Sequence, residues 1–527
     1  MSRLEKVAIA VVVTLGGAVL MALEVAAFRI IGRIYGTALR ETTTVIAVFL
    51  GAMSIGYFAG GRFADRRPRL ATLGGVLAIA APVVLAVSRF DVPLTEAIAG
   101  LSTAPALHAF VATIILFAIP TVLLASISPI AIRLLATDTA HTGRVAGGVS
   151  ALSTIGSIAG TVVTAFLLID LLGSIRLTVI VLAGATLLLT ALLGAASLPR
   201  LLRTGASRRS LRSAPVLIAS ATAVVLGGLL LEHFAGKAGA GPGASSWTLF
   251  AADTPYHHVV VTERPPGTRH LYINGTLQSS YIVEDPHRRG LPYEEYKHFA
   301  KLVRPGLRRV LGIGLGGGTS ARQFTAYYPE VEFDTVEIDP VVVDVAQRYF
   351  DVVPDDRLRL HVGDGRAFVR RTAERYDMIT VDAYTRGRYG ATIPPHLVTR
   401  EFFVEAEERL NDGGILHFHC FVGRDAGFAR SLFKTMAAVF PAVVVLGETE
   451  LFASTAPLHL DPDDLRERAG ALRERLPEID ERLATLRTIP PRTDDVPLLT
   501  DDFAPVDALL REAFREGRWS PPDRREK

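Results

Sequence analysis

The sequence predicts a multi-pass α-helical membrane bundle, followed by a doubly wound α/β domain that a small antiparallel β-sheet precedes. Two observations carry this prediction: long apolar stretches fill the first 235 residues, and strand-like and helix-like segments alternate after residue 300. A length of 527 residues exceeds one compact domain, and an apolar share of 49% is typical of membrane proteins. The formal charge of +3, from 56 basic and 53 acidic residues, gives no indication of a nucleic-acid partner.

Residues 1–235 are predicted to form a bundle of about seven helices, since roughly 20 apolar residues cross a bilayer. The apolar stretches are 7–29, 43–61, 71–88, 108–135, 145–169, 175–198 and 214–231. No small-residue cleavage site follows the first stretch, so we interpret it as a retained helix. Small residues at four-residue spacing, in GAMSIGYFAGG and GSIAG, favour close contacts between helices within a lipid bilayer.

The charged loops predict a multi-pass protein of the cell membrane but leave the side of the α/β domain open. Basic residues cluster in loops on one side, which the positive-inside rule places in the cytoplasm together with the amino terminus. Seven crossings then place the following domain outside, whereas the ligand chemistry argued below favours the cytoplasm. A broken or re-entrant segment near Pro120 and Pro129 would change the count of crossings.

The chain after the bundle divides by composition into four segments. Residues 236–248 are rich in Gly, Ala and Pro and predict a linker. Residues 249–300 contain strand-like runs separated by PPGT and NGT turns, then a helix in YEEYKHFAKLV. Residues 301–445 alternate strands and helices, which predicts a Rossmann-like nucleotide-binding core, and residues 446–527 predict a charged helical extension.

A glycine-rich turn follows the first strand of the predicted core. In GIGLGGGTS, the absence of side chains at Gly314 and Gly316 allows a ligand to approach the backbone closely. This turn alone suits a dinucleotide, an adenosyl-sulfonium compound or plain tight packing.

Acidic residues stand at the ends of the next three strands. Glu337 lies about 20 residues after the glycines, where a carboxylate can accept both hydroxyls of a ribose. Asp364, within GDG, is placed to accept from an adenine amino group, and Asp382 ends the following strand. Since ligands bind beyond the carboxyl ends of parallel strands, these three acids predict one nucleoside site.

Successive motifs of the second half resemble those of the spermidine synthase (polyamine aminopropyltransferase) family. They are VLGIGLGGG, VEIDPVVVDVAQRYF, HVGDGRAF, YDMITVDAY and TREFFVEAEERLNDGGIL. The resemblance spans roughly residues 254–440, and with the apolar first half and LLTDDFAPVDALL it is similar to the membrane-fused bacterial branch. It implies an S-adenosyl-binding domain, decarboxylated S-adenosylmethionine as co-substrate, no prosthetic group and a homodimer formed through the soluble domain.

The resemblance also implies roles for individual residues. Glu337 would hold the ribose, Asp364 with Gly365 would hold the adenine, and Asp382 matches the catalytic acid. A cationic amine must lose a proton before it attacks the carbon beside a sulfonium, and a carboxylate can attract the cation and relay that proton. Tyr293 matches the active-site tyrosine of the family.

The sequence departs from the family at four positions of the site. His257 stands where the family has a glutamine, and Glu294 where it has a histidine. Gly317 and Thr385 replace aspartates that bind the polyamine, and Arg386 and Arg388 follow Thr385. Loss of two anions and gain of two cations weakens binding of a dicationic amine.

The resulting hypothesis is transfer of propylamine from decarboxylated S-adenosylmethionine to putrescine or a related amine, giving spermidine and methylthioadenosine. One alternative is an S-adenosylmethionine-dependent methyltransferase or another transferase with a membrane-associated acceptor. The other is a transporter or sensor whose α/β domain only binds a nucleotide. No metal site is predicted, because His417 and His419 are interpreted as core residues and the single Cys420 excludes multi-cysteine zinc sites.

Overall fold

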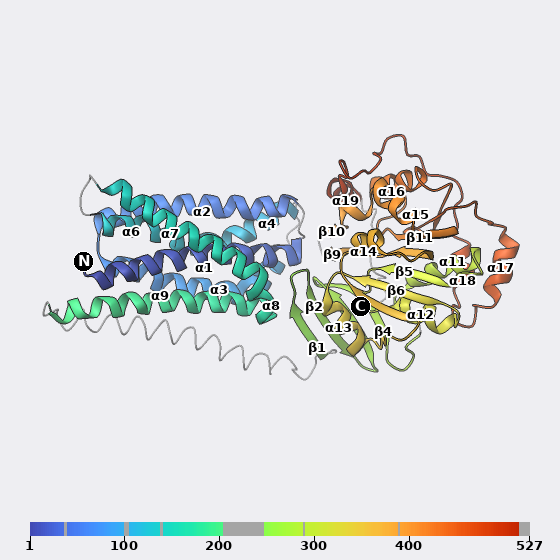
Figure 1. Ribbon diagram of the computed structural model, residues 1–527, viewed down its shortest axis with the longest axis horizontal. Helices are drawn as coiled ribbons and strands as arrows, with labels where there is room; N and C mark the ends of the chain where they lie inside the picture. Colours follow the sequence, from blue (N-terminus) through green and yellow to red (C-terminus); the bar gives the residue numbers. More distant parts are fainter. Residues whose placement is uncertain are drawn as a thin grey trace. The chain divides into compact units, whose positions relative to one another are not determined.

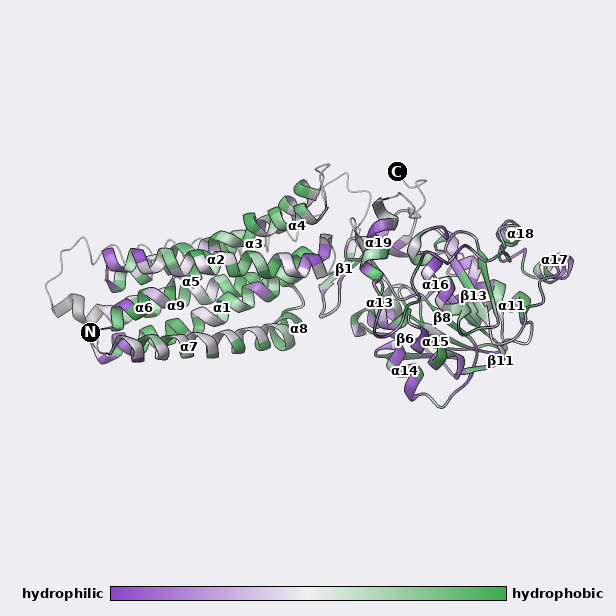
Figure 2. Ribbon diagram, turned by 90° about the horizontal axis from the view of Figure 1, so that it is seen from above, coloured by the Kyte–Doolittle hydropathy of each residue, from purple (hydrophilic) through white to green (hydrophobic). Residues whose placement is uncertain are grey.

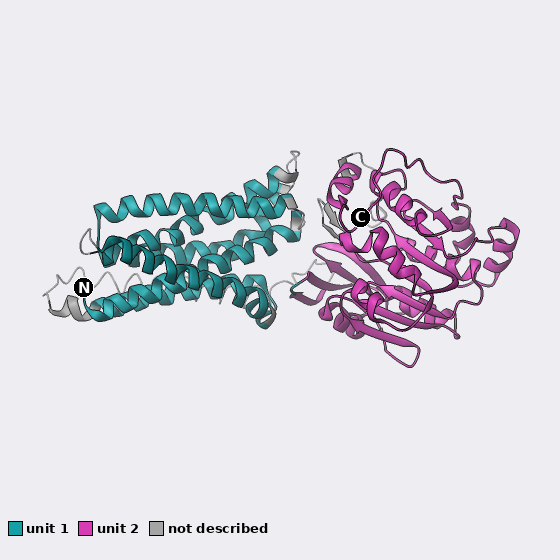
Figure 3. Cartoon of the chain, turned by 45° about the horizontal axis from the view of Figure 1, so that its top comes forward, with its two compact units in different colours: residues 1–244, 253–255 teal, residues 245–252, 256–527 magenta. Residues whose placement is uncertain are grey.

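The computed structural model describes residues 1–35, 39–99, 105–136, 141–203, 247–287, 290–387 and 390–515. The chain divides into two compact units, and Figure 3 colours them separately. The first comprises residues 1–244 and 253–255, and the second comprises residues 245–252 and 256–527. This division agrees with the expected change from apolar helices to an α/β domain.

The described residues of the first unit up to residue 203 form helices joined by short connections (Figure 1). Its elements are α1 (Arg3–Tyr35), α2 (Leu39–Arg66), α3 (Leu70–Ala99), α4 (Pro105–Thr113), the π-helical turn η1 (Ile114–Ala118), α5 (Ile119–Ala125), α6 (Ile127–Leu135), α7 (Thr142–Val163), the π-helical turn η2 (Thr164–Leu168), α8 (Ile169–Leu172) and α9 (Ile175–Arg203). Figure 2 shows how strongly hydrophobic residues dominate these helices.

Six helical stretches among the described residues are long and apolar enough to cross a membrane. They are Arg3–Arg33, Arg40–Arg66, Leu70–Thr95, Leu107–Leu135, Thr142–Leu168 and Ile175–Ser197. The first six predicted stretches are therefore confirmed as apolar helices. The seventh, 214–231, lies outside the described residues.

Glycines allow a close helix contact between α1 and α7 in the first unit. A Cβ atom added to Gly156 would lie 1.7 Å from the carbonyl oxygen of Thr14, and one added to Gly160 would lie 2.2 Å from that of Ala18. Any larger residue at either position would push the two helices apart. The GSIAG spacing thus acts as predicted for closely packed apolar helices.

The second unit begins with a four-stranded sheet in the order β1-β2-β3-β4. The strands are β1 (Trp247–Asp253), β2 (His258–Arg264), β3 (Thr268–Ile273) and β4 (Thr276–Ile282). The β2–β3 and β3–β4 pairs are antiparallel, as predicted. Asn274 and Gly275 have φ angles of 52° and 77°, which the tight turn between β3 and β4 requires and these residue types tolerate.

A seven-stranded sheet forms the centre of the second unit, in the order β12-β13-β11-β8-β5-β6-β7. The strands are β5 (Arg309–Ile313), β6 (Glu332–Glu337), β7 (Leu358–Val362), β8 (Tyr376–Val381), β11 (Leu410–His419), β12 (Ala442–Leu446) and β13 (Glu450–Ser454). The five strands from β11 to β7 run parallel, and the strand order reverses between β5 and β8. Ligands bind at such a switch point, beyond the carboxyl ends of the strands.

Helices cover both faces of this sheet, as two separate hydrophobic cores indicate. The helices and short elements are η3 (Pro292–His298), α11 (Phe299–Val303), α12 (Thr319–Tyr327), α13 (Pro340–Tyr349), α14 (Gly365–Arg371), η4 (Pro395–Leu397), α15 (Arg400–Glu407), α16 (Gly427–Ala437), α17 (Pro462–Gly470), α18 (Ile479–Leu483), α19 (Val506–Arg515), and the strands β9 (Thr385–Gly387) and β10 (Gly390–Thr392). Phe324 and Phe350 belong to one core, and Phe402 and Phe428 to the other. The predicted doubly wound, Rossmann-like architecture is confirmed.

Two predicted details differ from the structure. The segment expected as one helix over YEEYKHFAKLV is a 3₁₀ helix, η3, that passes into the short α11. The expected end of the core at residue 445 falls inside the sheet, because β13 pairs with both β11 and β12. The predicted charged helical extension begins only with α17, which the short helix α18 follows.

Candidate functional site

One cavity of about 270 Å³ lies at the carboxyl ends of the parallel strands. Glu337 at the end of β6, Asp364 after β7 and Asp382 after β8 all line it. The glycine turn after β5 forms another wall, and Gly314 is required there because a Cβ atom would lie 2.2 Å from the carbonyl oxygen of Asp382. The structure therefore brings the three predicted carboxylates together at one site.

Backbone amides hold the Glu337 carboxylate. Its Oε2 accepts from the amide of Leu315 at 3.0 Å, and its Oε1 accepts from the amide of Asp339 at 3.1 Å. Burial raises the pKa of Glu337, and the two backbone N–H groups oppose that rise. Each carboxylate oxygen keeps a second lone pair, so Glu337 can still accept from two adjacent hydroxyls.

His257 lines the cavity beside this carboxylate. Its Nδ1 lies 3.1 Å from Oδ2 of Asp339, while Oδ1 of Asp339 accepts from the amide of Val341 at the start of α13. Asp339 is buried, and it therefore fixes the imidazole relative to the first turn of the helix. The predicted cofactor position His257 thus adjoins Glu337 in space.

Asp364 caps the amino terminus of α14. Its Oδ1 accepts from the amide of Ala367 at 2.8 Å, and its Oδ2 lies 2.9 Å from Nε2 of His396. His396 also lines the cavity and has no counterpart among the predicted residues. Gly365 follows without a side chain, since a Cβ atom there would lie 2.3 Å from Cγ2 of Ile313.

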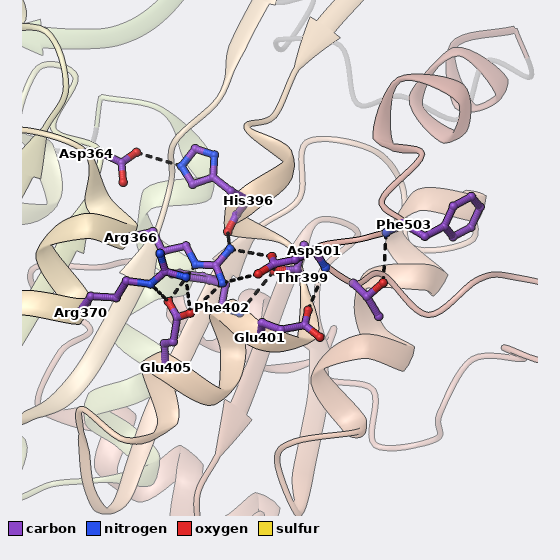
Figure 4. A network of polar contacts seen from close by, with 11 residues as sticks. Asp364, Arg366, Arg370, His396, Thr399, Glu401, Phe402, Glu405, Asp501 and Phe503 are labelled. Atoms are coloured by element: carbon purple, nitrogen blue, oxygen red, sulfur yellow. Dashed lines mark hydrogen bonds and ion pairs between the residues drawn. The ribbon is translucent and has the colours of Figure 1, made fainter.

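A network of charged residues supports the Asp364 corner, as Figure 4 shows. The buried Arg366 donates to both oxygens of Glu405 at 2.8 and 2.7 Å, and to both oxygens of Asp501 at 2.7 and 2.8 Å. It also donates to the carbonyl oxygen of His396 at 3.1 Å. Arg366 thereby connects α14, the cavity residue His396 and the segment that contains Asp501.

A buried lysine contacts the Asp382 carboxylate. Nζ of Lys297 donates to Oδ2 of Asp382 at 2.7 Å, to Oε2 of Glu294 at 2.9 Å and to Oγ of Ser320 at 2.8 Å. The hydroxyl of Ser320 donates to the same Glu294 oxygen at 2.6 Å. All four residues line the cavity, so two carboxylates share one ammonium group there.

These contacts keep both partners of the ion pair charged. Burial raises the pKa of Asp382, but the charges of Lys297 and then His419 outweigh it and hold that pKa below its usual value. Burial lowers the pKa of Lys297, yet the adjacent carboxylates of Asp382 and Glu294 raise it overall. Asp382 is therefore ionised and Lys297 protonated at neutral pH.

The ring of Tyr293 lines this part of the cavity, and a cluster of two histidines and a carboxylate lies next to it. The ring of Tyr293 stacks on that of His419 with their centroids 4.1 Å apart. Glu450 is buried and accepts from both His417 and His419, at 2.9 and 2.6 Å. Burial raises the pKa of Glu450, but the two imidazoles lower it overall. The two histidines thus hold a buried carboxylate rather than apolar neighbours alone.

At two positions that the sequence predicts to bind the amine, Gly317 and Thr385, no described side chain lines the cavity. The amide of Gly317 donates to Oγ of Ser279 at 2.8 Å, and a Cβ atom at Gly317 would lie 2.6 Å from Cβ of Ser279. Gly317 itself does not line the cavity, in contrast to the expectation, whereas the neighbouring Gly316 does. Thr385 begins β9, but its side chain and residue Arg388 lie outside the described part of the chain.

The remaining predicted residues line the same cavity. They are His257, Tyr293, Glu294, Gly314, Gly316, Glu337, Asp364, Gly365 and Asp382. Sequence reasoning missed Lys297, Ser320 and His396. A signal existed for Lys297, which lies four residues after Tyr293, because this spacing places both on one face of the α-helix that the sequence predicts there.

Comparisons with known proteins place the similarity in the second unit. Residues 292–440 match the family described as spermine/spermidine synthase domain. A polyamine aminopropyltransferase of Vibrio vulnificus (strain CMCP6) is 33% identical over 230 residues, which cover 41% of this chain and 75% of that protein. An eEF1A lysine and N-terminal methyltransferase of Xenopus laevis is 31% identical over 178 residues, covering 32% of this chain and 25% of that protein. The crystal structure of a probable spermidine synthase from Corynebacterium glutamicum ATCC 13032 aligns with a TM-score of 0.39 and 21% identity, covering 42% of this chain and 86% of that one.

Proposed function

This chain belongs to the spermine/spermidine synthase family, and we propose that it transfers an aminopropyl group from decarboxylated S-adenosylmethionine to putrescine or a related amine. The observation that carries this proposal is the convergence of Glu337, Asp364 and Asp382 on one cavity. The products are methylthioadenosine and an amine extended by one aminopropyl group, which is spermidine when putrescine is the acceptor.

The donor binds along the glycine turn in this proposal. The free lone pairs of Glu337 accept the ribose hydroxyls, and Asp364 accepts from the adenine amino group. His257 borders the ribose position through its contact with Asp339. The sulfonium then points towards Asp382, because the carboxyl end of β8 adjoins that of β5 at the switch point.

Asp382 acts on the acceptor amine. The amine arrives as an ammonium ion and transfers one proton to the carboxylate, which relays it to solvent. The freed lone pair then attacks the methylene carbon beside the sulfonium, so that a C–N bond forms and the C–S bond breaks. The electron pair of the broken bond stays on sulfur, which leaves as a neutral thioether and needs no acid.

The test uses the purified full chain in detergent or lipid, with labelled decarboxylated S-adenosylmethionine and a panel of amines. We expect amine-dependent release of methylthioadenosine. Absence of methylthioadenosine with every amine, from protein that binds the nucleoside, would reject the transfer.

Methyl transfer is a second candidate, favoured by the similarity to the Xenopus laevis methyltransferase. Both reactions use the same nucleoside corner and differ in which carbon beside the sulfonium is attacked. S-adenosylmethionine in the same assay separates them, since methyl transfer releases S-adenosylhomocysteine. A methyltransferase gives that product with an acceptor and gives no methylthioadenosine from the decarboxylated donor.

We further propose that the first unit lies in the lipid bilayer of the cell membrane. Large apolar side chains on its helices are exposed, among them Phe58 at 72%, Phe166 at 79% and Leu188 at 71%. Such surfaces are costly in water and favourable against lipid. A reporter fused to the C-terminus of the chain and assayed in intact cells would identify the side of the membrane on which the second unit lies. Light scattering of the purified chain would test whether it forms a homodimer.

A further inference from the structure

Lys297 occupies an unusual place for a lysine, because its ammonium group is buried inside the cavity wall. The residue is 2% exposed, and its three N–H donors match three acceptors, one each on Glu294, Ser320 and Asp382. Nζ also lies 5.2 Å from the centroid of the Tyr293 ring. The side chain is therefore fixed by its contacts and does not extend into solvent.

This ammonium bridges Oδ2 of Asp382 and Oε2 of Glu294, where the non-reacting ammonium of a diamine would bind, and the proposed transfer uses the other oxygen of Asp382 for the amine that reacts. A primary ammonium of an acceptor has the same charge and the same three donors as Nζ of Lys297. Because Nζ lies 2.7 Å from Oδ2 of Asp382, a second ammonium on that oxygen would meet a like charge at contact distance.

The other carboxylate that lines this part of the cavity is matched by the same cation, because Glu294 shares Lys297 with Asp382. Glu450 does not line the cavity, and its carboxylate accepts from His417 and His419. We call the part of the cavity around Asp382 and Glu294 the acceptor side. Among the described residues, each carboxylate that lines it therefore has a protein cation at contact distance, and Gly317 provides no further carboxylate.

We propose that Lys297 is a specificity-determining residue that replaces one ammonium group of a diamine, so that the enzyme selects acceptors with a single amino group. The inference rests on the proposed aminopropyl transfer and names the acceptor class of the same site. The rings of Tyr293 and Tyr384 line this part of the cavity and suit the uncharged remainder of such an acceptor.

Butylamine and putrescine form a matched pair of probes, since both have four carbons and they differ in one amino group. We expect the wild-type full chain to use butylamine with a kcat/KM at least about tenfold above that for putrescine, because of the like charge of Lys297. Lys297→Met removes this charge and leaves Asp382 and Glu294 to bind the second ammonium. Its ratio should shift towards putrescine by about 10- to 100-fold.

Lys301→Met is the matched control, because Lys301 contacts Glu330 and the carbonyl oxygen of Leu307, and does not line the cavity. Its ratio should equal that of the wild type. A wild-type preference for putrescine over butylamine overturns the inference and leaves the proposed transfer intact. Because this comparison uses the wild type alone, it tests the inference even if Lys297→Met does not fold. An unchanged ratio in folded Lys297→Met also overturns it, whereas absence of methylthioadenosine with every amine overturns the transfer itself.

Discussion

The donor side of the cavity, around Glu337 and Asp364, and its acceptor side hold their carboxylates by different means. On the donor side, Glu337 accepts from the backbone amides of Leu315, in the glycine turn, and Asp339, while Asp364 accepts from the amide of Ala367 and also contacts the imidazole of His396. On the acceptor side, Asp382 and Glu294 are both bound by the side-chain cation of Lys297. Backbone amides leave a carboxylate its negative charge to offer to a ligand, whereas a cation at contact distance compensates it.

This difference separates two functions of the site. The donor side recognises hydroxyl and amino groups, which need acceptors and no net charge. On the acceptor side, the net charge of the side chains determines which amines bind, so a single substitution there changes the choice of acceptor. Variants should therefore affect binding of the nucleoside on one side and turnover or acceptor choice on the other.

The largest expected effect is that of Asp382→Asn, which removes the group that takes the acceptor proton. We expect kcat to fall by about 10²- to 10⁴-fold while the Kd for methylthioadenosine stays near that of the wild type. Product formation and calorimetric binding measure the two quantities. Asp344→Asn is the control, because Asp344 is an exposed carboxylate on α13 paired with Arg348. Equal activity of Asp382→Asn and wild type would remove Asp382 from the mechanism.

The next effect is that of Glu337→Gln on nucleoside affinity. The amide keeps one acceptor oxygen and loses the charge, so the Kd for methylthioadenosine should rise by about 10- to 100-fold. Glu332→Gln at the opposite end of the same strand is the matched control, since its side chain is 43% exposed and lies outside the cavity. An unchanged Kd in Glu337→Gln would place the ribose elsewhere.

Acid should destabilise the folded chain through His298, the buried neighbour of Lys297. Burial lowers the pKa of His298 to about 4, and the neutral ring bonds Tyr328 and Gln323 at 2.9 and 3.2 Å. The unfolded chain binds a proton near pH 6.5 and the folded chain does not, so stability falls as the pH decreases from 6.5 towards 4, by on the order of 1 to 3 kcal/mol.

Thermal unfolding across this pH range measures the effect. His298→Gln should show a shallower loss of stability between pH 6.5 and 4 than the wild type. His459→Gln, which changes a histidine whose side chain is 63% exposed, should retain the wild-type slope. The same slope in His298→Gln and wild type would show that His298 does not cause the loss of stability in acid.

The smallest effect is expected for Asp501→Asn, which acts on the donor side from a distance. Arg366 lowers the pKa of Asp501 to about 2, so their ion pair persists above that pH and is lost as the pH falls through it. Asp501 is 42% exposed, and solvent screening limits the pair, so the Kd for methylthioadenosine should rise only about 2- to 5-fold through His396 and Asp364. Asp502→Asn, at the exposed adjacent position, is the control, and an equal Kd in both variants would contradict the connection.

The sequence predicts the donor side more completely than the acceptor side for a physical reason. Glu337 and Asp364 stand at strand ends within short motifs, and a parallel sheet brings strand ends to one edge. The contact between Lys297 and Asp382 joins residues 85 positions apart, and Glu450 reaches His419 only through antiparallel pairing of β13 with β11. No local pattern encodes such pairings.

The difference between local patterns and contacts distant in the sequence also explains how well the domain boundaries are predicted. Apolar length and small-residue spacing predict six described membrane-length helices directly. The predicted end of the core at residue 445 excludes β13, which pairs with the neighbouring β12 and joins the rest of the sheet through β11, more than 30 residues earlier.

The most direct test of this account is an experimental structure of the full chain with methylthioadenosine bound. We expect both ribose hydroxyls within hydrogen-bond distance of Glu337, the adenine amino group at Asp364, and the thioether sulfur facing Asp382. A nucleoside bound outside the cavity, or one whose ribose contacts neither oxygen of Glu337, would contradict the assignment of the donor side and the reaction that depends on it.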